Sequence, residues 1–104
     1  MDTLKRLEAT IAERASASPD SSYVAKLNTA GTAKIAQKLG EEATETVIAS
    51  LIGSREELVG EAADVLFHLT VLLQNKGVSL DEVMAELDRR EGVSGLDEKA
   101  SRSE

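Results

Sequence analysis

The sequence contains no cysteine and no tryptophan, and it has one proline, one histidine, one tyrosine and one phenylalanine. A chain without cysteine can form neither a disulfide framework nor a thiolate metal site, which fits a reducing compartment. Because Tyr23 and Phe67 are the only aromatic residues, the interior must be aliphatic, and a chain of 104 residues then buries a modest fraction of its surface. We therefore expect a single domain that self-associates.

The sequence also lacks an apolar stretch long enough to cross a membrane. The longest one, Val65 to Leu73, is interrupted by His68 and Thr70 and is too short. The first residues, MDTLKRLEATIAERA, carry charges throughout and have no apolar core of a signal peptide. These features predict a cytoplasmic protein without a membrane partner.

Positive charge is scarce as well. The chain has 12 basic and 19 acidic residues, a formal net charge of -7, which repels polyanions and argues against a nucleic acid polymer as partner. A small phosphate ligand held by a few local lysines remains compatible with this charge. A content of 41% hydrophobic and 30% charged residues is typical of a globular protein with one core.

The pattern of apolar residues predicts helices along the chain and no β-strand. Serines followed three residues later by glutamate, as in Ser54 with Glu57 and Ser79 with Glu82, are capping boxes that mark helix starts. Residues 92–104 are rich in glycine, serine and charge and predict an extended tail. The expected helices cover residues 2–14, 23–28, 32 or 33 to 51, 55 to about 77, and 80–90.

Acidic residues recur at helical spacing in two neighbouring predicted helices. In QKLGEEATETVIAS, Glu41 and Glu45 share a stripe with Lys34 and Lys38, and Glu42 lies at the border between that stripe and the apolar side.

The next helix carries a second acidic face, formed by Glu57, Glu61, Asp64 and His68, while most of its remaining circumference is apolar. A helix that is apolar on most sides is a buried helix, so we expect Glu61 and Asp64 to point into an enclosed place.

Carboxylates gathered in such a place need a counter-charge, because an isolated buried carboxylate costs on the order of several kcal/mol. Lys34 and Lys38 are the only cations on that face and sit beside glutamates of their own helix, so a divalent cation is the simplest answer. Oxygen ligands, with no cysteine and one histidine available, favour Mg²⁺ or Mn²⁺ over Zn²⁺. Mg²⁺ usually keeps water ligands, and those positions are open to phosphate oxygens.

Simpler structural explanations stay open at this point. The acids of the first helix could form a solvated face, supported by Lys38 four residues before Glu42. Lys34 could be an ordinary surface lysine, and a lone histidine such as His68 is more often a hydrogen-bonded interior residue than a ligand. For the acids of the second helix this explanation is weaker, because that helix is apolar on so much of its circumference.

Four segments together resemble the phosphoribosyl-ATP pyrophosphohydrolase family: SSYVAKL, KIAQKLGEEATETVIA, GEAADVLFHLTVLL and REGVSGLDEKASR. The likeness runs from about Leu4 to Arg102, and the family is similar to the MazG-like all-α NTP pyrophosphatases. The resemblance implies an all-α helical bundle completed by homodimerisation. It also implies a single catalytic domain over residues 1–91 and a tail, residues 92–104, that contributes to the substrate pocket.

The resemblance further implies a role for each candidate residue. Mg²⁺, with Mn²⁺ as a substitute, would be held by four carboxylates: Glu42, Glu45, Glu61 and Asp64. Glu41 would be an added ligand or a base, so that all five acids belong to the catalytic set. Substrate contacts would come from the region Gly92 to Gly95 and from Lys34, Lys38, Tyr23, Lys26 and His68.

The implied reaction is hydrolysis of phosphoribosyl-ATP to phosphoribosyl-AMP and pyrophosphate, the second step of histidine biosynthesis, by Mg²⁺-assisted attack of water on the α-phosphorus. Two alternatives stay open. One is an enzyme of the same fold that cleaves ordinary or damaged dNTPs, against which the segment REGVSGL argues. The other is a non-enzymatic helical dimerisation module whose acids lie on the surface.

Overall fold

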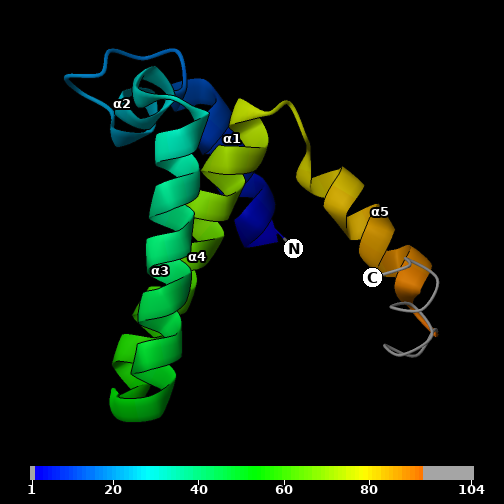
Figure 1. The fold of residues 1–104 in the computed structure, drawn as a ribbon. Coiled ribbons are helices and arrows are strands. Elements are labelled where there is room, and N and C mark those ends of the chain that lie inside the picture. The colour runs from blue at the N-terminus through cyan, green and yellow to red at the C-terminus, as the bar shows by residue number, and fades with distance from the viewer. Residues whose placement is uncertain (1, 93–104) are drawn as a thin grey trace.

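The structure, a computed structural model, describes residues 2–92, and this part of the chain contains five helices and no strand. The all-α prediction is confirmed. Two helices end later than predicted: the second continues to Ala30 instead of Asn28, and the third to Ile52 instead of Leu51. Figure 1 shows the helices in chain order: α1 (Asp2–Arg14), α2 (Tyr23–Ala30), α3 (Thr32–Ile52), α4 (Arg55–Asn75) and α5 (Leu80–Arg90).

Serine side chains cap three helices at their N-termini. The Ser54 hydroxyl accepts a hydrogen bond from the Glu57 amide (3.1 Å), and the Glu57 carboxylate accepts one from the Ser54 amide (2.9 Å). Ser79 and Glu82 form the same capping box before α5, and Ser22 caps α2. The caps bond amides that lack a partner within the helix, which typically stabilises by about 1 kcal/mol each, and both predicted capping boxes are confirmed.

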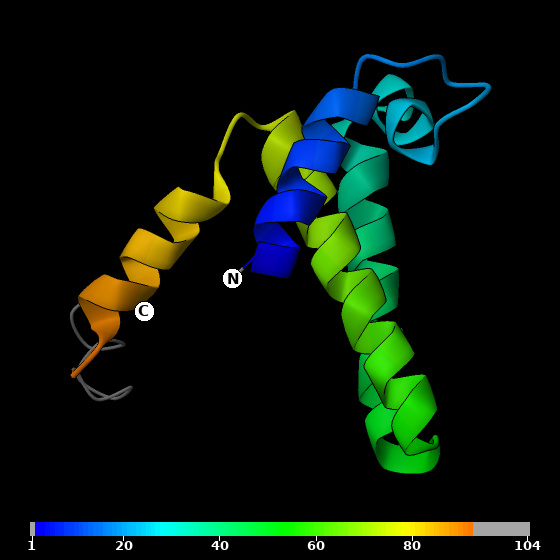
Figure 2. The same cartoon turned by 180° about the vertical axis from the view of Figure 1, so that it is seen from behind.

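The two longest helices, α3 and α4, run antiparallel and side by side as a hairpin, which turns at Gly53 and Ser54 (Figures 1 and 2). Near the other end of this hairpin, α1 packs along α4 and α2 lies across the start of α3. Gly31 both ends α2 and begins α3, with φ at 104°, a conformation that glycine adopts without the strain of a side chain. The sharp change of direction between these helices therefore needs glycine.

The hydrophobic core lies where α1, α2, α3 and α4 meet, away from the hairpin turn. Its buried members come from all four helices, and Ile35 and Val71 are fully enclosed (both 0% exposed). Phe67 and Leu72 pack against this cluster from α4. As predicted from the composition, the core itself is aliphatic: Ile11, Val24, Leu27, Ile35 and Val71.

Helix α5 diverges from the hairpin and is joined to α1 by polar contacts at its first turn (Figures 1 and 2). The Leu80 amide donates to the Glu8 carboxylate (2.7 Å), and the Lys5 ammonium lies 2.8 Å from a carboxylate oxygen of Asp81. Beyond this turn α5 extends away from the core, so the sides of α4 and α5 that face each other are not covered within the single chain.

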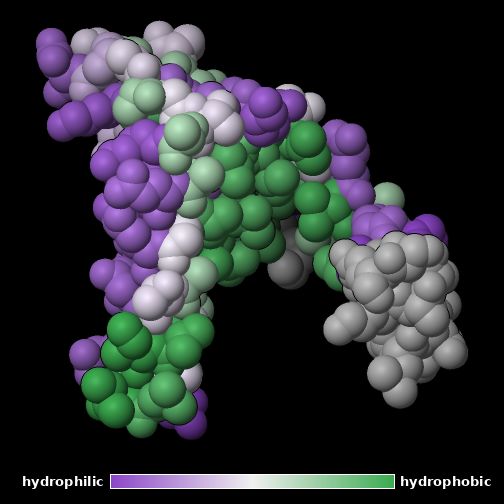
Figure 3. Space-filling model, viewed as in Figure 1, coloured by the Kyte–Doolittle hydropathy of each residue, from purple (hydrophilic) through white to green (hydrophobic). Residues whose placement is uncertain are grey.

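Large apolar side chains are exposed in two places (Figure 3). One is the space between the hairpin and α5, and of the two helices beside it, α4 carries Leu66 (45% exposed) and α5 carries Leu87 (53% exposed). At the hairpin tip, where only two helices pack, exposure reaches 84%, and the residues are Val47, Ile48, Leu51, Ile52 and Val59. Exposed apolar patches of this kind commonly mark interaction sites.

Truncation of Ile35 should destabilise the fold strongly. Ile35→Ala removes a fully buried side chain where four helices meet, so we expect the free energy of unfolding to fall by about 2–5 kcal/mol in chemical denaturation. Thr44→Ala, at an exposed position of the same helix, is the control and should change it by less than about 0.5 kcal/mol. Equal effects of the two substitutions would contradict this location of the core.

Candidate functional site

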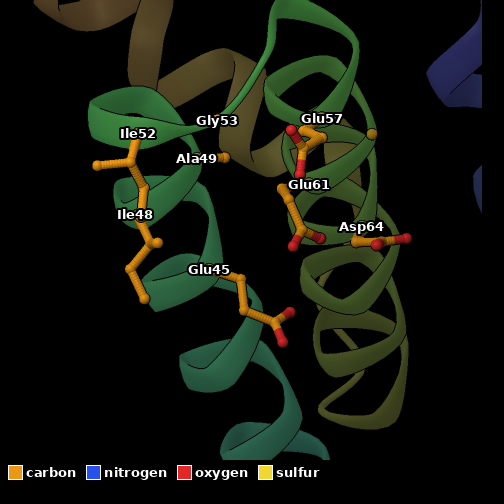
Figure 4. A pocket seen from close by; sticks show the side chains of 9 residues that line it. Glu45, Ile48, Ala49, Ile52, Gly53, Glu57, Glu61 and Asp64 are labelled. Carbon is orange, nitrogen blue, oxygen red and sulfur yellow. The ribbon is translucent and has the colours of Figure 1, made fainter.

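Three carboxylates from two helices converge in the middle of the hairpin. Glu42 and Glu45 of α3 and Glu61 of α4 each place one carboxylate oxygen so that the three atoms lie within 4.8 Å of one another. Residues three apart share one helix face, and the antiparallel packing of α3 on α4 turns these faces toward each other. Figure 4 shows Glu45 and Glu61 projecting into the space between the helices, with the Asp64 carboxylate directed away from Glu45. We call these three residues the carboxylate cluster.

The cluster raises the proton affinity of Glu42. Its pKa is raised to about 7, first because the Glu45 carboxyl is near enough to share a proton with it. Burial and the negative charges of Glu45, Asp64 and Glu61 act in the same direction. The Oε2 atom of Glu42 is buried and finds no hydrogen-bond partner among the described residues. A buried carboxylate oxygen without a partner is unfavourable, so this position requires a proton or a cation.

The acid pair of α4 is less enclosed than the sequence analysis expected. Glu61 is half-buried and its pKa is raised, mainly by burial and then by the charge of Glu45 and by Asp64. Asp64 is exposed. The expectation followed from the apolar circumference of α4, but those apolar residues lie on other faces of the helix than Asp64, and some of them, such as Leu66, are themselves exposed.

A groove of about 380 Å³ extends from the carboxylate cluster toward the hairpin tip. The acids lie at one end and apolar side chains of α3 at the other, so the groove has a polar end and an apolar end. Sequence reasoning missed this apolar part, although Ile48, Ala49 and Ile52 follow Glu45 at helical spacing and so share its face. The full lining is Glu45, Ile48, Ala49, Ile52, Gly53, Glu57, Gly60, Glu61 and Asp64.

Glu41, the fifth predicted acid, is engaged apart from the cluster. Its carboxylate accepts a hydrogen bond from the Gln37 amide (2.8 Å) and lies 3.4 Å from the Lys38 ammonium. These two contacts, with Lys34 contributing less, lower the pKa of Glu41 and make it a weaker base. The ion pair of Lys38 thus forms with Glu41, three residues on, whereas the sequence analysis had considered Glu42, four residues on.

Two of the predicted substrate residues, Tyr23 and His68, contact each other, and a third, Lys26, is exposed. The Tyr23 hydroxyl lies 3.0 Å from Nε2 of His68, which is only 5% exposed. Lys26 is exposed on α2. Of the predicted region from Gly92 to Gly95, residues 93–95 lie outside the described part, as does the rest of the tail to residue 104.

The ammonium of Lys38 interacts electrostatically with Glu42 of the carboxylate cluster and with Tyr23. Its pKa is raised first by Glu41, and then also by Tyr23 and Glu42. Lys38 therefore lies within electrostatic range of both Tyr23 and Glu42. Lys34, one turn earlier on α3, is exposed. The same side of α3 can offer both cations to an anionic ligand.

Fold and site together define an all-α protein with an acidic cluster between two antiparallel helices. Among residues 2–92, no helix combines the length and apolar character needed to span a membrane. The family model described as "PRA-PH: Phosphoribosyl-ATP pyrophosphohydrolase" matches residues 4–91. The chain belongs to this family, which confirms the resemblance seen in the sequence.

Relatives named "Phosphoribosyl-ATP pyrophosphatase" match almost the whole chain. The protein of Erythrobacter litoralis is 72% identical over 104 residues, which are 100% of both chains. That of Novosphingobium aromaticivorans is 69% identical over 102 residues, covering 98% of this chain and 95% of its own length.

Without divalent cations, stability should fall as the pH rises from about 5 to about 8. The native pKa of Glu42, about 7, lies above its ordinary value of 4.5, so in this window the native state binds more protons than the unfolded chain. Stability then decreases with pH. Because their pKa values are lowered, Glu41, Glu57 and Glu86 titrate below the window.

The measurement is thermal unfolding of chelated protein across this pH range. Glu42→Gln should remove most of the decrease in Tm, and Mg²⁺ added at the alkaline end should raise the Tm of the unsubstituted protein, since the ion binds deprotonated ligands. A Tm that increases from about pH 5 to about pH 8 and does not change when Mg²⁺ is added would contradict the raised pKa of Glu42 and cation binding at the cluster.

Proposed function

We propose that this chain hydrolyses phosphoribosyl-ATP to phosphoribosyl-AMP and pyrophosphate, the second step of histidine biosynthesis. The observation that carries the proposal is the carboxylate cluster, three acids from α3 and α4 within 4.8 Å, in a chain that its family model matches over residues 4–91. Relatives that share up to 72% of the sequence bear the name of this activity. The nearby lysines suit the phosphates of such a substrate.

The donor set of the cluster fits Mg²⁺. All its potential ligands are carboxylate oxygens, which Mg²⁺ prefers. One of these oxygens is buried without a partner, and neighbouring acids raise the pKa values of Glu42 and Glu61. A hard dication relieves both of these conditions at once. Bound there, the ion would neutralise charge on the triphosphate, act as a Lewis acid and lower the pKa of water. Glu42, Glu45 and Glu61 would hold it, and Asp64, the fourth predicted ligand, would have to turn its carboxylate toward them.

The remaining chemistry falls to side chains of this protein. The oxygen of a water molecule bonds to the α-phosphorus, the bond from that phosphorus to the bridging oxygen breaks, and pyrophosphate leaves with the electron pair. The water proton passes to a carboxylate. Lys38 and Lys34 can hold the phosphates in place.

Activity should require both the cation and the cluster. Chelation should abolish phosphoribosyl-ATP hydrolysis, and Mg²⁺ or Mn²⁺ should restore it. Glu45→Gln and Glu61→Gln should each lower kcat/KM by at least about 100-fold, the upper range for loss of a residue that supports a metal ligand. Glu56→Gln is the matched control, since it makes the same charge change at an exposed position of α4 and should leave the rate unchanged. Full activity after exhaustive chelation would refute the metal requirement.

The substrate itself is tested by comparing kcat/KM for phosphoribosyl-ATP and for dNTPs in one assay. We expect phosphoribosyl-ATP to be preferred. A preference for dNTPs would instead favour a nucleotide pyrophosphatase of the same fold. No turnover of either, with unchanged Tm on addition of Mg²⁺, would favour the non-enzymatic helical module.

We also propose that the protein is a homodimer. The single chain leaves Leu66 of α4 and Leu87 of α5 exposed, apolar surface gathers between the hairpin and α5 (Figure 3), and the hairpin tip carries further exposed aliphatic side chains. Burial of apolar surface is the main favourable term in association, and a second copy offers matching apolar faces through two-fold symmetry.

Charge placed at Leu66 or Leu87 should dissociate the dimer. Sedimentation velocity should give twice the chain mass of 11.1 kDa for the unsubstituted protein and the mass of one chain for Leu66→Glu or Leu87→Glu. Thr29→Glu, an exposed position on α2, should leave the dimer intact. A monomeric unsubstituted protein at micromolar concentration would refute the homodimer.

A further inference from the structure

His68 lies in the core side of α4, one helical turn after Asp64, and both of its ring nitrogens are engaged. Nδ1 is 2.8 Å from the backbone carbonyl oxygen of Asp64. A carbonyl oxygen can only accept, so Nδ1 carries the proton and donates it. In the neutral ring Nε2 is then an acceptor, and the Tyr23 hydroxyl, 3.0 Å away, donates to it. These two bonds define one tautomer of the histidine.

This arrangement leaves His68 unable to contact a substrate directly. The residue is 5% exposed, and neither nitrogen is free for another partner in this arrangement. The sequence analysis had placed His68 among the substrate contacts. Its buried position and its two hydrogen bonds point instead to an action through its neighbours.

Tyr23 is the neighbour that can reach a ligand. It is 48% exposed, although its ring is held on one side by Phe67, at 6.1 Å between centroids and 18° between planes, and at its edge by His68. Tyr23 is the first residue of α2, whereas His68 and Phe67 belong to α4. The hydroxyl bond therefore couples the start of α2 to the turn of α4 that begins at Asp64.

The location of Tyr23 also links it to the charged part of the site. Tyr23 is among the groups that raise the pKa of Lys38, and so is Glu42 of the carboxylate cluster. A half-exposed aromatic ring that is stacked on Phe67 and lies within electrostatic range of a lysine is suited to contact the nucleoside part of a nucleotide whose phosphates lie at the cations.

We infer that His68 is a positioning residue: through its bonds to the Asp64 carbonyl and the Tyr23 hydroxyl, it fixes the exposed ring of Tyr23 as a substrate contact. This inference rests on the proposed function, since it concerns the substrate of the same site. A core histidine with a purely structural role would contribute to stability alone. A positioning residue changes substrate binding through Tyr23, so the two roles differ in what they do to KM.

The test uses the full chain at one pH, well below the Tm of each variant. Tyr23→Phe keeps the stacked ring and removes the hydroxyl, and His68→Leu removes the acceptor. Each should raise KM for phosphoribosyl-ATP about 5- to 10-fold, the value of one net hydrogen bond, with a smaller change in kcat. The double variant should be no worse than the worse single one, because both remove the same bond. His68→Gln, whose side-chain oxygen can accept from Tyr23, should recover most of the loss.

A spectroscopic readout is available that needs no turnover. Tyr23 is the only tyrosine and the chain has no tryptophan, so the near-ultraviolet circular dichroism band of tyrosine reports this ring alone. The band should weaken in His68→Leu and return in His68→Gln. Thr70→Val is the matched control, because Thr70 is equally buried on α4 (2% exposed) and bonds only within its helix. It should lower Tm without changing KM or the tyrosine band.

The outcomes separate this inference from the proposed function. No hydrolysis of phosphoribosyl-ATP by the unsubstituted protein refutes the proposed function. Hydrolysis with unchanged KM in Tyr23→Phe, or fully additive effects of Tyr23→Phe and His68→Leu, overturns the positioning role while leaving the activity standing. If His68→Leu does not fold, Tyr23→Phe and His68→Gln still decide: a raised KM only in the former supports the inference, and an unchanged KM in the former overturns it.

Discussion

Repulsion among carboxylates held close together is the constraint around which this small protein is arranged. The antiparallel packing of α3 on α4 brings the acids of Glu42, Glu45 and Glu61 within 4.8 Å. The pKa of Glu42 is raised to about 7, first by the Glu45 carboxyl on the same helix and then by burial and the charges of its acidic neighbours. A chain selected only for stability would gain by separating these charges or by pairing them with lysine. Here the nearest lysine, Lys38, pairs instead with Glu41. The cluster is thus left with a need for positive charge that a cation and its bound phosphates can meet together.

The fold supports this arrangement by placing stability and chemistry at different parts of one hairpin. The aliphatic core gathers at the end where α1 and α2 join the hairpin, and the acids sit farther along it, where only two helices pack (Figures 1 and 2). The carboxylates can then face each other without disturbing the buried cluster. The consequence is that apolar side chains near the tip, such as Leu51 and Ile52, have no cover within the chain. A second copy is the natural source of that cover.

Much of the fold could be predicted from local patterns. Helix starts depend on neighbouring residues, so the capping boxes at Ser54 and Ser79 located two helices correctly, and the turn residues located their ends to within a few positions. The acid pairs were identifiable for the same reason, since residues three apart share a helix face wherever the helix goes. Covering of α4 could not be predicted, because it depends on where α5 and any second copy lie. Asp64 was expected to be enclosed because most of its helix is apolar, and it is exposed in the single chain.

By itself, the sequence determined which residues form helices, which faces of those helices are acidic or apolar, and to which family the chain belongs, because all three depend on residue identity and short-range spacing. Only the tertiary structure decided which acids share a site. In it, Glu42, Glu45 and Glu61 face one another. Glu41 forms an ion pair with Lys38, and Tyr23 forms a hydrogen bond with His68, 45 positions further along the chain. Side-chain partners between helices follow from the angle and rotation at which those helices pack, and no local spacing encodes that geometry.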